Sequence, residues 1–203
     1  MASIYGEYEE TLNRIKEDLE SRFLAYQDRC LSETGEKGFE HFLVRVKTDE
    51  SMREKCRRKN VPETAESALV TMKDAIGIRV VCSFIDDVFR AIEFVRNLEG
   101  CEVIEEKDYI RHAKPNGYRS YHMILAVHTS EKDVLGKEPG TYYVELQLRT
   151  IAMDTWAALE HRMKYKKDIP NQELLVSELK RVADELASCD LSMQTIRELI
   201  DTL

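Results

Sequence analysis

Two acidic residues could support phosphate chemistry in a chain that has no glycine-rich phosphate loop. Asp74 precedes a β-branched run at 78–84, and Glu145 lies within an alternating stretch at 142–149. The P-loop, dinucleotide-binding, zinc-protease and nucleophile-elbow motifs are all absent from the sequence. Side chains must then hold any phosphates, and Mg²⁺ prefers one or two carboxylates together with phosphate oxygens. Either acid alone would be interpreted as a surface residue, so the hypothesis depends on their acting as a pair.

The stretch 142–149 alternates in the way that is typical of a strand with two different faces. Its apolar face consists of Tyr142, Val144, Leu146 and Leu148. Its other face consists of Tyr143, Glu145, Gln147 and Arg149. Such a strand could form the floor of a polar site, because residues two apart point to the same side. An ordinary solvent-facing strand would show the same alternation.

Basic residues are concentrated in two segments of a chain whose net charge is −8. Residues 41–60 contain seven Lys and Arg against three acids, and residues 107–122 contain four against one. A basic pocket in an acidic body suits a small polyanion such as a nucleotide, although two solvated loops would explain the pattern equally well. The acidic balance argues against a protein that coats nucleic acid over its whole surface.

The spacing of apolar residues predicts a sheet enclosed by helices. We expect an α+β fold with a mixed sheet of about five strands and with long helices near both ends. The predicted strands are 42–46, 78–84, 102–110, 121–127 and 142–149. The predicted helices are 4–30, 51–60, 63–73, 86–98, 150–166 and 173–203, the last with a possible break at 188–192. Ser51-x-x-Glu54 resembles a capping box, and Asp86 or Asp87 is expected to cap the helix that follows.

Composition excludes several classes of protein. The chain has 203 residues, is 43% hydrophobic and 33% charged, and contains few Gly and Pro, which disfavours disorder and fibrous repeats. We expect no membrane association, because no apolar run is long enough for a spanning helix. The N-terminal segment lacks the apolar core of a secretion signal. The odd number of cysteines, without C-x-x-C, fits reduced thiols and a cytoplasmic location.

Five ordered segments give the sequence a specific resemblance. They are R-V-K-x3-S-x3-K at 45–55, D-A-I-G-I-R-V-V at 74–81, K-P-N-G-Y-R-S-Y-H at 114–122, E-L-Q-L-R-T at 145–150 and W-A-A-L-E-H-x3-Y-K at 156–166. In this order they resemble the synthetase domain of the RelA/SpoT family, and in particular the small alarmone synthetases that make guanosine tetra- and pentaphosphate. Each segment is weak alone, whereas the ordered set is highly specific.

The resemblance implies a Mg²⁺-dependent pyrophosphokinase, a GTP/GDP diphosphokinase. Such an enzyme moves the β,γ-diphosphate of ATP to the 3′-hydroxyl of GDP or GTP, giving (p)ppGpp and AMP. By the same resemblance, Asp74 and Glu145 are the catalytic and metal-binding acids, with Glu145 near the reacting hydroxyl. The implied ATP-binding residues are Arg45, Lys47, Ser51, Lys55 and Arg79, with Arg53 as a further candidate. The implied GDP- or GTP-binding residues are Lys114, Asn116, Tyr118, Arg119, His122 and Gln147.

Within these roles, Arg45 and Arg79 are expected to sandwich adenine, and Tyr118 is expected to stack on guanine. The resemblance further implies a nucleotidyltransferase-like sheet in one synthetase domain over 1–203. This domain comprises an N-terminal helix at 1–35, a catalytic core at 39–168 and a C-terminal helical segment at 171–203. No His-Asp dipeptide occurs, so we expect no hydrolase half. A homo-oligomer is expected, with a tetramer favoured.

Several alternatives stay open at this point. Another nucleotidyltransferase, acting at the α-phosphate, could share the same sheet and paired acids. A catalytically inactive nucleotide sensor or an RNA-binding regulator is a second alternative, which the intact Asp74 and Glu145 disfavour. The sequence does not distinguish GDP from GTP as the preferred acceptor. It also leaves open the roles of Glu160 and His161 and any regulation by RNA or by an alarmone.

Overall fold

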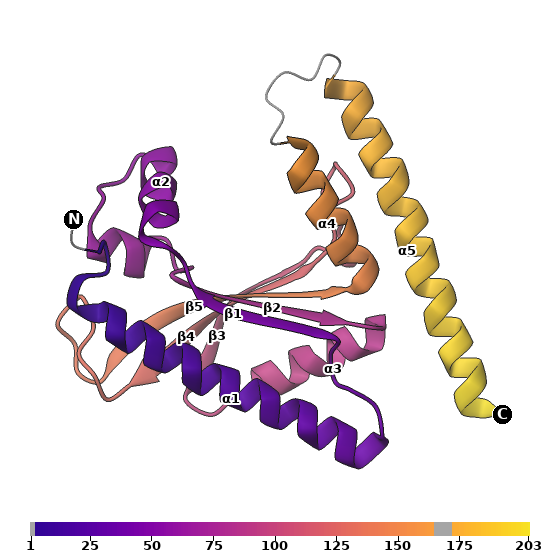
Figure 1. Cartoon of the computed structure of the whole chain (residues 1–203), viewed down its shortest axis with the longest axis horizontal. Coiled ribbons are helices and arrows are strands. Elements are labelled where there is room, and N and C mark those ends of the chain that lie inside the picture. Colours follow the sequence, from indigo (N-terminus) through magenta and orange to yellow (C-terminus); the bar gives the residue numbers. More distant parts are fainter. Residues whose placement is uncertain (1–2, 165–171) are drawn as a thin grey trace.

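A five-stranded sheet forms the centre of the computed structural model, which describes residues 3–164 and 172–203. The strand order is β1-β2-β5-β4-β3 (Figure 1). Strands β2 and β5 run parallel, whereas the other neighbouring pairs are antiparallel. The predicted α+β class, with a mixed sheet and a long helix near each end, is therefore confirmed. The fifth of the family-like segments, 156–166, ends in Tyr165 and Lys166, which lie outside the described residues.

The strands lie close to their predicted positions, and the helices flank them. The strands are β1 (His41–Val46), β2 (Ile76–Cys82), β3 (Cys101–Asp108), β4 (Tyr121–Thr129) and β5 (Gly140–Thr150). The helices are η1 (Gly6–Tyr8), α1 (Glu9–Thr34), α2 (Asp49–Lys59), η2 (Ser67–Thr71), α3 (Ile85–Arg96), α4 (Ile151–Lys164) and α5 (Gln172–Thr202). No helix in the described part of the chain combines the length and the apolar character that a membrane span needs.

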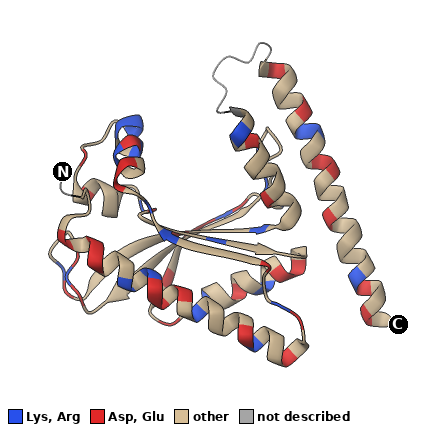
Figure 2. Ribbon diagram, in the orientation of Figure 1, with Lys and Arg blue, Asp and Glu red and all other residues tan. Residues whose placement is uncertain are grey.

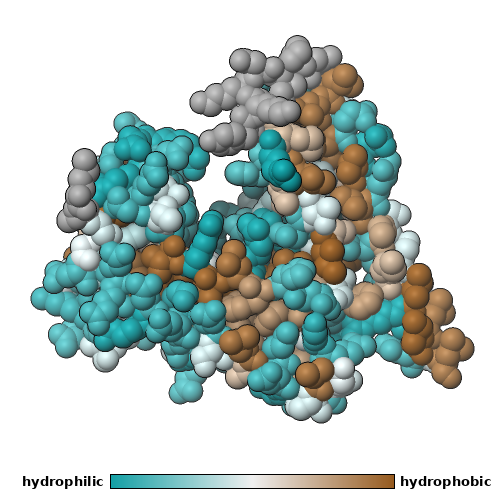
Figure 3. Space-filling model, viewed as in Figure 1, coloured by the Kyte–Doolittle hydropathy of each residue, from teal (hydrophilic) through white to brown (hydrophobic). Residues whose placement is uncertain are grey.

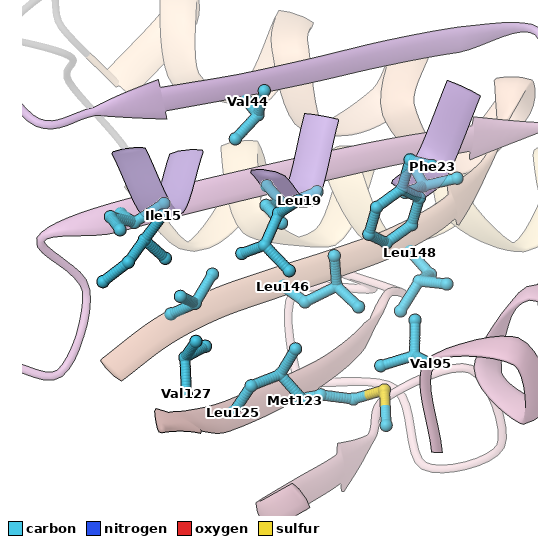
Figure 4. Packing of buried hydrophobic residues seen from close by; sticks show 14 of the residues in the cluster. Ile15, Leu19, Phe23, Val44, Val95, Met123, Leu125, Val127, Leu146 and Leu148 are labelled. Atoms are coloured by element: carbon cyan, nitrogen blue, oxygen red, sulfur yellow. The ribbon is translucent and has the colours of Figure 1, made fainter. Parts of the chain in front are cut away.

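The two faces of the sheet have different environments. Helices α1 and α3 cover one face, where apolar side chains from α1 and from the central strands meet in one packed layer (Figure 4). The apolar residues predicted on β5, from Tyr142 to Leu148, are at most 2% exposed. The other face lies between α2 and the α4–α5 pair, where the space-filling view shows a hydrophilic hollow (Figure 3). Burial of one face thus leaves the other available for a site.

Two predicted helix starts are wrong by a few residues. The N-cap of α2 is Thr48, whose side chain accepts a hydrogen bond from the Ser51 backbone N–H at 3.3 Å. Ser51 therefore belongs to the first turn of α2 and does not cap it. Phe84 precedes α3 without a side-chain cap, and Asp86 and Asp87 lie in the first turn. Their carboxylates favour that position because the helix dipole is positive there.

Two other helical predictions are corrected by the structure. The possible break at 188–192 is absent, because α5 is one continuous helix. The stretch 63–73 contains only the short η2 as a named helical element.

Helix α5 holds the loop that connects β3 to β4. The Trp156 indole of α4 donates to the Leu179 carbonyl at 2.8 Å, and the Thr150 hydroxyl donates to Asp190 at 2.6 Å. Gly117, with φ of +88°, sits so close to α5 that an added Cβ would lie 2.4 Å from the Ala183 Cβ. The C-terminal helix therefore determines where the 114–120 segment can lie.

We expect Gly117→Ala to lower the free energy of unfolding for two reasons, the positive φ at this position and the clash of the new Cβ with α5. The matched control is Gly136→Ala, where φ is +79° but the nearest atom to an added Cβ is the mobile Lys132 Cε at 3.5 Å. The control should cost about 1 kcal/mol, and Gly117→Ala should cost a further 1–3 kcal/mol or so through overpacking against α5. Urea denaturation of both variants measures the difference. Equal losses would show that the α5 contact is not a tight one.

Candidate active site

Strand pairing places the polar candidates in two rows on the open face of the sheet. The first row runs through Arg45, Gly77, Glu145 and Ile124. The second row runs through Leu43, Arg79, Gln147, His122 and Lys107. Directly paired residues on neighbouring strands point to the same side, so each row lies across the strands. Residues that are more than 60 positions apart in the sequence are brought side by side in this way.

Glu145 lies where two cavities meet. The first, of about 120 Å³, is lined by β1, β2, β5 and the residues next to them, and its charged residues include Arg45, Lys47, Asp74 and Arg79. The second, of about 340 Å³, lies toward β3 and β4 and is lined in part by Lys73, Lys107 and His122. Glu145 is the one residue common to these two linings. A group bound in either cavity would therefore face the same carboxylate.

Asp74 is held at the edge of the first cavity by two lysines. Its Oδ2 atom pairs with Lys47 and, at 2.6 Å, with the Lys55 Nζ on α2. The residue is 6% exposed, and its Oδ1 atom is buried without a hydrogen-bond partner among the described residues. An unsatisfied carboxylate oxygen is costly to bury, so its presence beside a cavity indicates that a ligand completes it.

The residue before Asp74 has an unusual backbone. Lys73 has φ of +54°, in the left-handed region that residues with a Cβ seldom occupy. Strain of this kind is concentrated at functional sites, where surrounding contacts maintain it. The Lys73 ammonium lies 5.1 Å from the centre of the Tyr143 ring, and the residue lines the second cavity. Sequence analysis missed Lys73, because a single lysine carries no periodic signal.

Arg45 and Arg79 form the walls of a slot. Arg45 pairs with Gly77 and Leu43 pairs with Arg79, so the two arginines are diagonal neighbours on adjacent strands. Diagonal side chains of this kind are about 7–8 Å apart, which is roughly the 7 Å that a planar ring needs if each flat contact is about 3.5 Å. Leu43, which is 50% exposed, adds apolar surface to the slot. The slot therefore suits a planar heterocycle.

Some of the predicted donor-side residues lie farther out. Ser51 is exposed at the start of α2, where its hydroxyl accepts a bond from the Thr48 hydroxyl at 2.9 Å. Arg53 bonds Asp49 at 2.9 Å and approaches Glu63 at 3.5 Å. Lys55 reaches the site only through its contact with Asp74. The basic surface of α2 stands beside the open face of the sheet (Figure 2).

The predicted acceptor-side residues divide into two groups. His122 and Gln147 are on the sheet floor, whereas Lys114, Asn116 and Tyr118 belong to the preceding loop. The Lys114 ammonium lies 4.7 Å from the Tyr118 ring centre. The Asn116 amide donates to Glu160 Oε1 of α4 at 3.1 Å, so Glu160 helps to hold the loop. His161 is exposed.

Arg119 points away from the two cavities. Its guanidinium donates to the Ile110 carbonyl at 2.8 Å and lies 3.6 Å from Asp184 of α5, and its Nε is buried without a partner among the described residues. These contacts assign Arg119 to the junction between loop and α5. Its predicted role as a direct acceptor ligand stays untested.

His122 is a neutral imidazole in this environment. Burial above all, together with the nearby cations Arg149, Lys114 and Lys107, lowers its pKa from 6.5 to about 4. Its Nδ1 atom is 3.9 Å from Glu145 Oε1, and its Nε2 atom is 2.8 Å from the Tyr118 hydroxyl. The contact with Glu145 is therefore not an ion pair at neutral pH.

The sequence placed Arg149 on the polar face of 142–149 without a role, and it gave no indication of Asp154. Arg149 is 4% exposed, and its guanidinium bonds Asp154 at 2.9 Å, Tyr118 at 2.7 Å and Gln147 at 2.8 Å. Asp154 also lies 3.6 Å from Arg79. The alternation of β5 identified the face of Arg149, two residues beyond Gln147, but not its partners. Asp154 had no comparable signal, because its partners come from other elements.

Comparisons with known proteins agree on one family. A family model described as "Region found in RelA / SpoT proteins" matches residues 44–170. The chain is 37% identical over 169 residues to GTP pyrophosphokinase YwaC of Bacillus subtilis, covering 82% of this chain and 78% of that protein. It is 36% identical over 157 residues to GTP pyrophosphokinase YjbM of the same organism, covering 75% and 69%.

Solved structures show the same fold. Small alarmone synthetase 1 from Bacillus subtilis, bound to its product pppGpp, has a TM-score of 0.79 and 30% identity, covering 93% of this chain and 94% of that one. Small alarmone synthetase 2 from the same organism has a TM-score of 0.75 and 32% identity, covering 95% and 98%.

The neutral His122 makes stability depend on pH in a defined direction. Between about pH 6.5 and pH 4 the unfolded chain binds a proton at this position that the folded chain does not, so stability falls as pH falls through this window. The loss should be on the order of 2–3 kcal/mol. Urea denaturation at pH 7 and pH 4.5 gives the loss of stability for the metal-free protein and for His122→Asn, and the difference between the two losses is the contribution of His122. Equal losses in the two proteins would contradict a buried neutral imidazole.

Proposed function

The chain belongs to the RelA/SpoT family, and from this premise we propose that it is a synthetase-only enzyme that makes (p)ppGpp. It transfers the β,γ-diphosphate of ATP to the 3′-hydroxyl of GDP or GTP and releases AMP. The observation that carries this function is the position of Glu145 between two cavities. A transfer between two nucleotides needs both bound on either side of one reacting centre, with donor and acceptor oxygens in line.

The first cavity suits ATP. Adenine enters the slot between Arg45 and Arg79, whose planar guanidinium groups stack on aromatic rings. Lys47 and Lys55 both pair with Asp74, and these two lysines neutralise the charge of the ATP phosphates. Arg53 adds to this positive region, although it also pairs with Asp49 and Glu63.

Mg²⁺ fits the acids of this cavity. The buried, unpartnered Oδ1 of Asp74 and the Glu145 carboxylate line the same space, and two carboxylates with phosphate oxygens are an ordinary Mg²⁺ ligand set. Among the described residues, no cluster of three or more His, Cys, Asp or Glu could hold a metal by itself, which agrees with a site completed by substrate. When bound, the ion would neutralise charge on the transferring phosphates.

Glu145 acts on the acceptor. It orients the ribose 3′-hydroxyl and takes its proton as the oxygen bonds to the β-phosphorus of ATP. The bond between that phosphorus and the oxygen bridging to the α-phosphate breaks, and AMP leaves with the bridging oxygen. Lys114 and the neutral His122 stand on the acceptor side, where Tyr118 can present its ring to guanine.

Incubation with ATP, Mg²⁺ and either GDP or GTP, followed by chromatography of the nucleotides, tests this function. AMP and a 3′-pyrophosphorylated guanosine nucleotide are expected, and omission of Mg²⁺ should stop their formation. Inorganic pyrophosphate with a nucleotidyl adduct would instead indicate transfer at the α-phosphate. Binding without turnover would indicate a nucleotide sensor.

A homo-oligomer is part of this proposal, with a tetramer as the preferred state. Helix α5 exposes a series of large apolar side chains, which are Val176, Leu191, Met193, Ile196, Leu199 and Ile200. Leu191 is 61% and Ile200 67% exposed. Figure 3 shows hydrophobic surface near the C-terminal end of α5. Contiguous apolar surface of this kind is typical of protein interfaces. The five free cysteines and the nucleotide substrates support a cytoplasmic location.

Asp74→Asn and Glu145→Gln should each lower kcat by a factor of about a hundred or more, because each removes a charge at the reacting centre. Both side chains line a cavity and neither is part of the apolar core, so both variants should fold. Asp74→Asn should lower the thermal midpoint more than Glu145→Gln, because it removes the carboxylate that Lys47 and Lys55 share. Initial rates and thermal denaturation measure the two effects. Turnover near that of the wild type in either variant would refute the assignment of that acid.

Arg45→Lys should weaken ATP binding although it keeps the positive charge. An ammonium cannot stack on adenine as a guanidinium does, and a stacking contact is worth roughly 1–3 kcal/mol, or about a tenfold to hundredfold rise in Kd. Calorimetric titration with a non-hydrolysable ATP analogue measures this. Unchanged affinity would identify Arg45 as a phosphate ligand and exclude the sandwich.

Light scattering at micromolar concentration should show an oligomer, with a tetramer of 23.6 kDa chains favoured. Leu191→Lys with Ile200→Lys should dissociate it, because each places a charge within the apolar surface of α5. Leu31→Lys on α1, where Leu31 is 52% exposed, is the matched control and should leave the mass unchanged. A single mass near 23.6 kDa for the wild type would contradict the proposal.

A further inference from the structure

Arg149 is a buried cation that lies below the acceptor loop and beside both halves of the site. Its guanidinium donates four hydrogen bonds, to Ser120, Asp154, Tyr118 and Gln147. Asp154 is its one carboxylate partner in the described chain and lies 26% exposed. Buried ion pairs are weak contributors to stability compared with apolar packing. Stability alone therefore does not explain why a cation is buried here, whereas a role in orienting the side chains that it bonds does.

The bond to Gln147 determines which way its amide points. Arginine has only donors, so the group that Gln147 presents at 2.8 Å must be its carbonyl oxygen. The amide nitrogen is then turned toward Glu145, where it donates to Oε2 at 3.3 Å. In the reverse orientation the Gln147 NH₂ group would face the N–H groups of Arg149, and its carbonyl oxygen would face the Glu145 carboxylate. Neither contact could form a hydrogen bond.

The bond to Tyr118 determines a second orientation in the same way. The Tyr118 hydroxyl accepts from Arg149 at 2.7 Å and lies 2.8 Å from the His122 Nε2. Donation from the hydroxyl to Nε2 gives each proton its own acceptor, whereas donation from an Nε2–H would place two donors, Arg149 and His122, on one oxygen. A neutral imidazole that accepts at Nε2 carries its proton on Nδ1. Nδ1 is the nitrogen that faces Glu145 Oε1 at 3.9 Å. This second branch therefore also ends in an N–H group directed at Glu145.

We propose that Arg149 is a positioning residue for the transfer reaction, because it makes Gln147 and the Tyr118–His122 pair present N–H groups to the two oxygens of Glu145. The role in turnover rests on the proposed function, whereas the proton positions are properties of the ligand-free chain. The Gln147 N–H bonds Oε2 and the His122 Nδ1–H faces Oε1 from 3.9 Å, so together they favour one orientation of the carboxylate, with its free lone pairs directed at the acceptor hydroxyl. Without Arg149 the Gln147 amide can reverse and His122 can adopt its other tautomer.

Arg149→Lys tests the proposal, because lysine keeps the charge and loses the fork that reaches Tyr118 and Gln147 together. The first measurement is the ¹⁵N spectrum of histidine-labelled, ligand-free protein, with His122 assigned by His122→Asn. The wild type should show the Nδ1–H tautomer, and Arg149→Lys a mixture. The second is steady-state kinetics, in which kcat should fall about tenfold to a hundredfold, as expected for a displaced catalytic group, with a smaller change in the KM for ATP.

Arg96→Lys is the matched control. Arg96 likewise bonds a carboxylate, Glu106, and a tyrosine hydroxyl, that of Tyr121, but it lines neither cavity at Glu145. Its replacement should change neither the His122 tautomer nor kcat. If Arg149→Lys does not fold, Tyr118→Phe removes the hydroxyl link alone and should release the His122 tautomer in the same spectrum.

Each result decides the proposal. An unchanged His122 tautomer in both Arg149→Lys and Tyr118→Phe overturns it, whatever the rates. A changed tautomer in Arg149→Lys with wild-type kcat overturns the role in turnover. If the wild type shows the Nδ1–H tautomer but makes no pyrophosphorylated nucleotide, the proposed function fails and the role of Arg149 in turnover fails with it, while the hydrogen-bond assignment stands.

Discussion

The parallel pairing of β2 with β5 is the constraint on which the site depends. It sets Gly77 beside Glu145 and Arg79 beside Gln147, and it brings the start of β2, where Asp74 lies, close to the central strand. A shift of one residue in this register would turn Glu145 and Gln147 into the apolar layer under α1 and α3. Burial of that layer therefore maintains the register, and the register maintains the distance between the two acids.

The edges of the sheet add the remaining parts of the site by different means. On one side, β1 supplies Arg45, and α2 supplies Lys55, which reaches down to Asp74. On the other side, β4 supplies His122 and the loop before it supplies Tyr118. The donor half is thus built on rigid strands, whereas much of the acceptor half is a loop. That loop needs support, which Glu160 of α4 and the close packing of α5 against Gly117 provide.

Helix α5 connects the site to the outer surface of the protein. Its inner face contributes Leu179 and Ala183 to a small cluster with Trp156, next to the acceptor loop. Its outer face exposes large apolar side chains, most of them between Leu191 and Ile200. One helix therefore supports the acceptor loop on one side and offers a surface for association on the other. Subunit association through this helix would also stabilise the loop that it contacts.

The sequence alone was sufficient for the fold class, the strand positions to within about two residues and the alternation of β5. These features follow from local periodicity and from residue types, which need no knowledge of partners. The pairing of Asp74 with Glu145 was a hypothesis at that stage, and the structure places both on one cavity. Their assigned roles at the metal stay predictions.

Only the tertiary structure decided what depends on partners from distant elements. The position of Arg119 at the junction of the loop with α5 follows from the Ile110 carbonyl and Asp184, and the burial of Arg149 follows from Tyr118 and Asp154. The continuity of α5 follows from its packing on α4, which no local pattern near residue 190 reveals. A side chain's direction is set by the neighbours that satisfy its hydrogen bonds, and those neighbours are known only once the chain has folded.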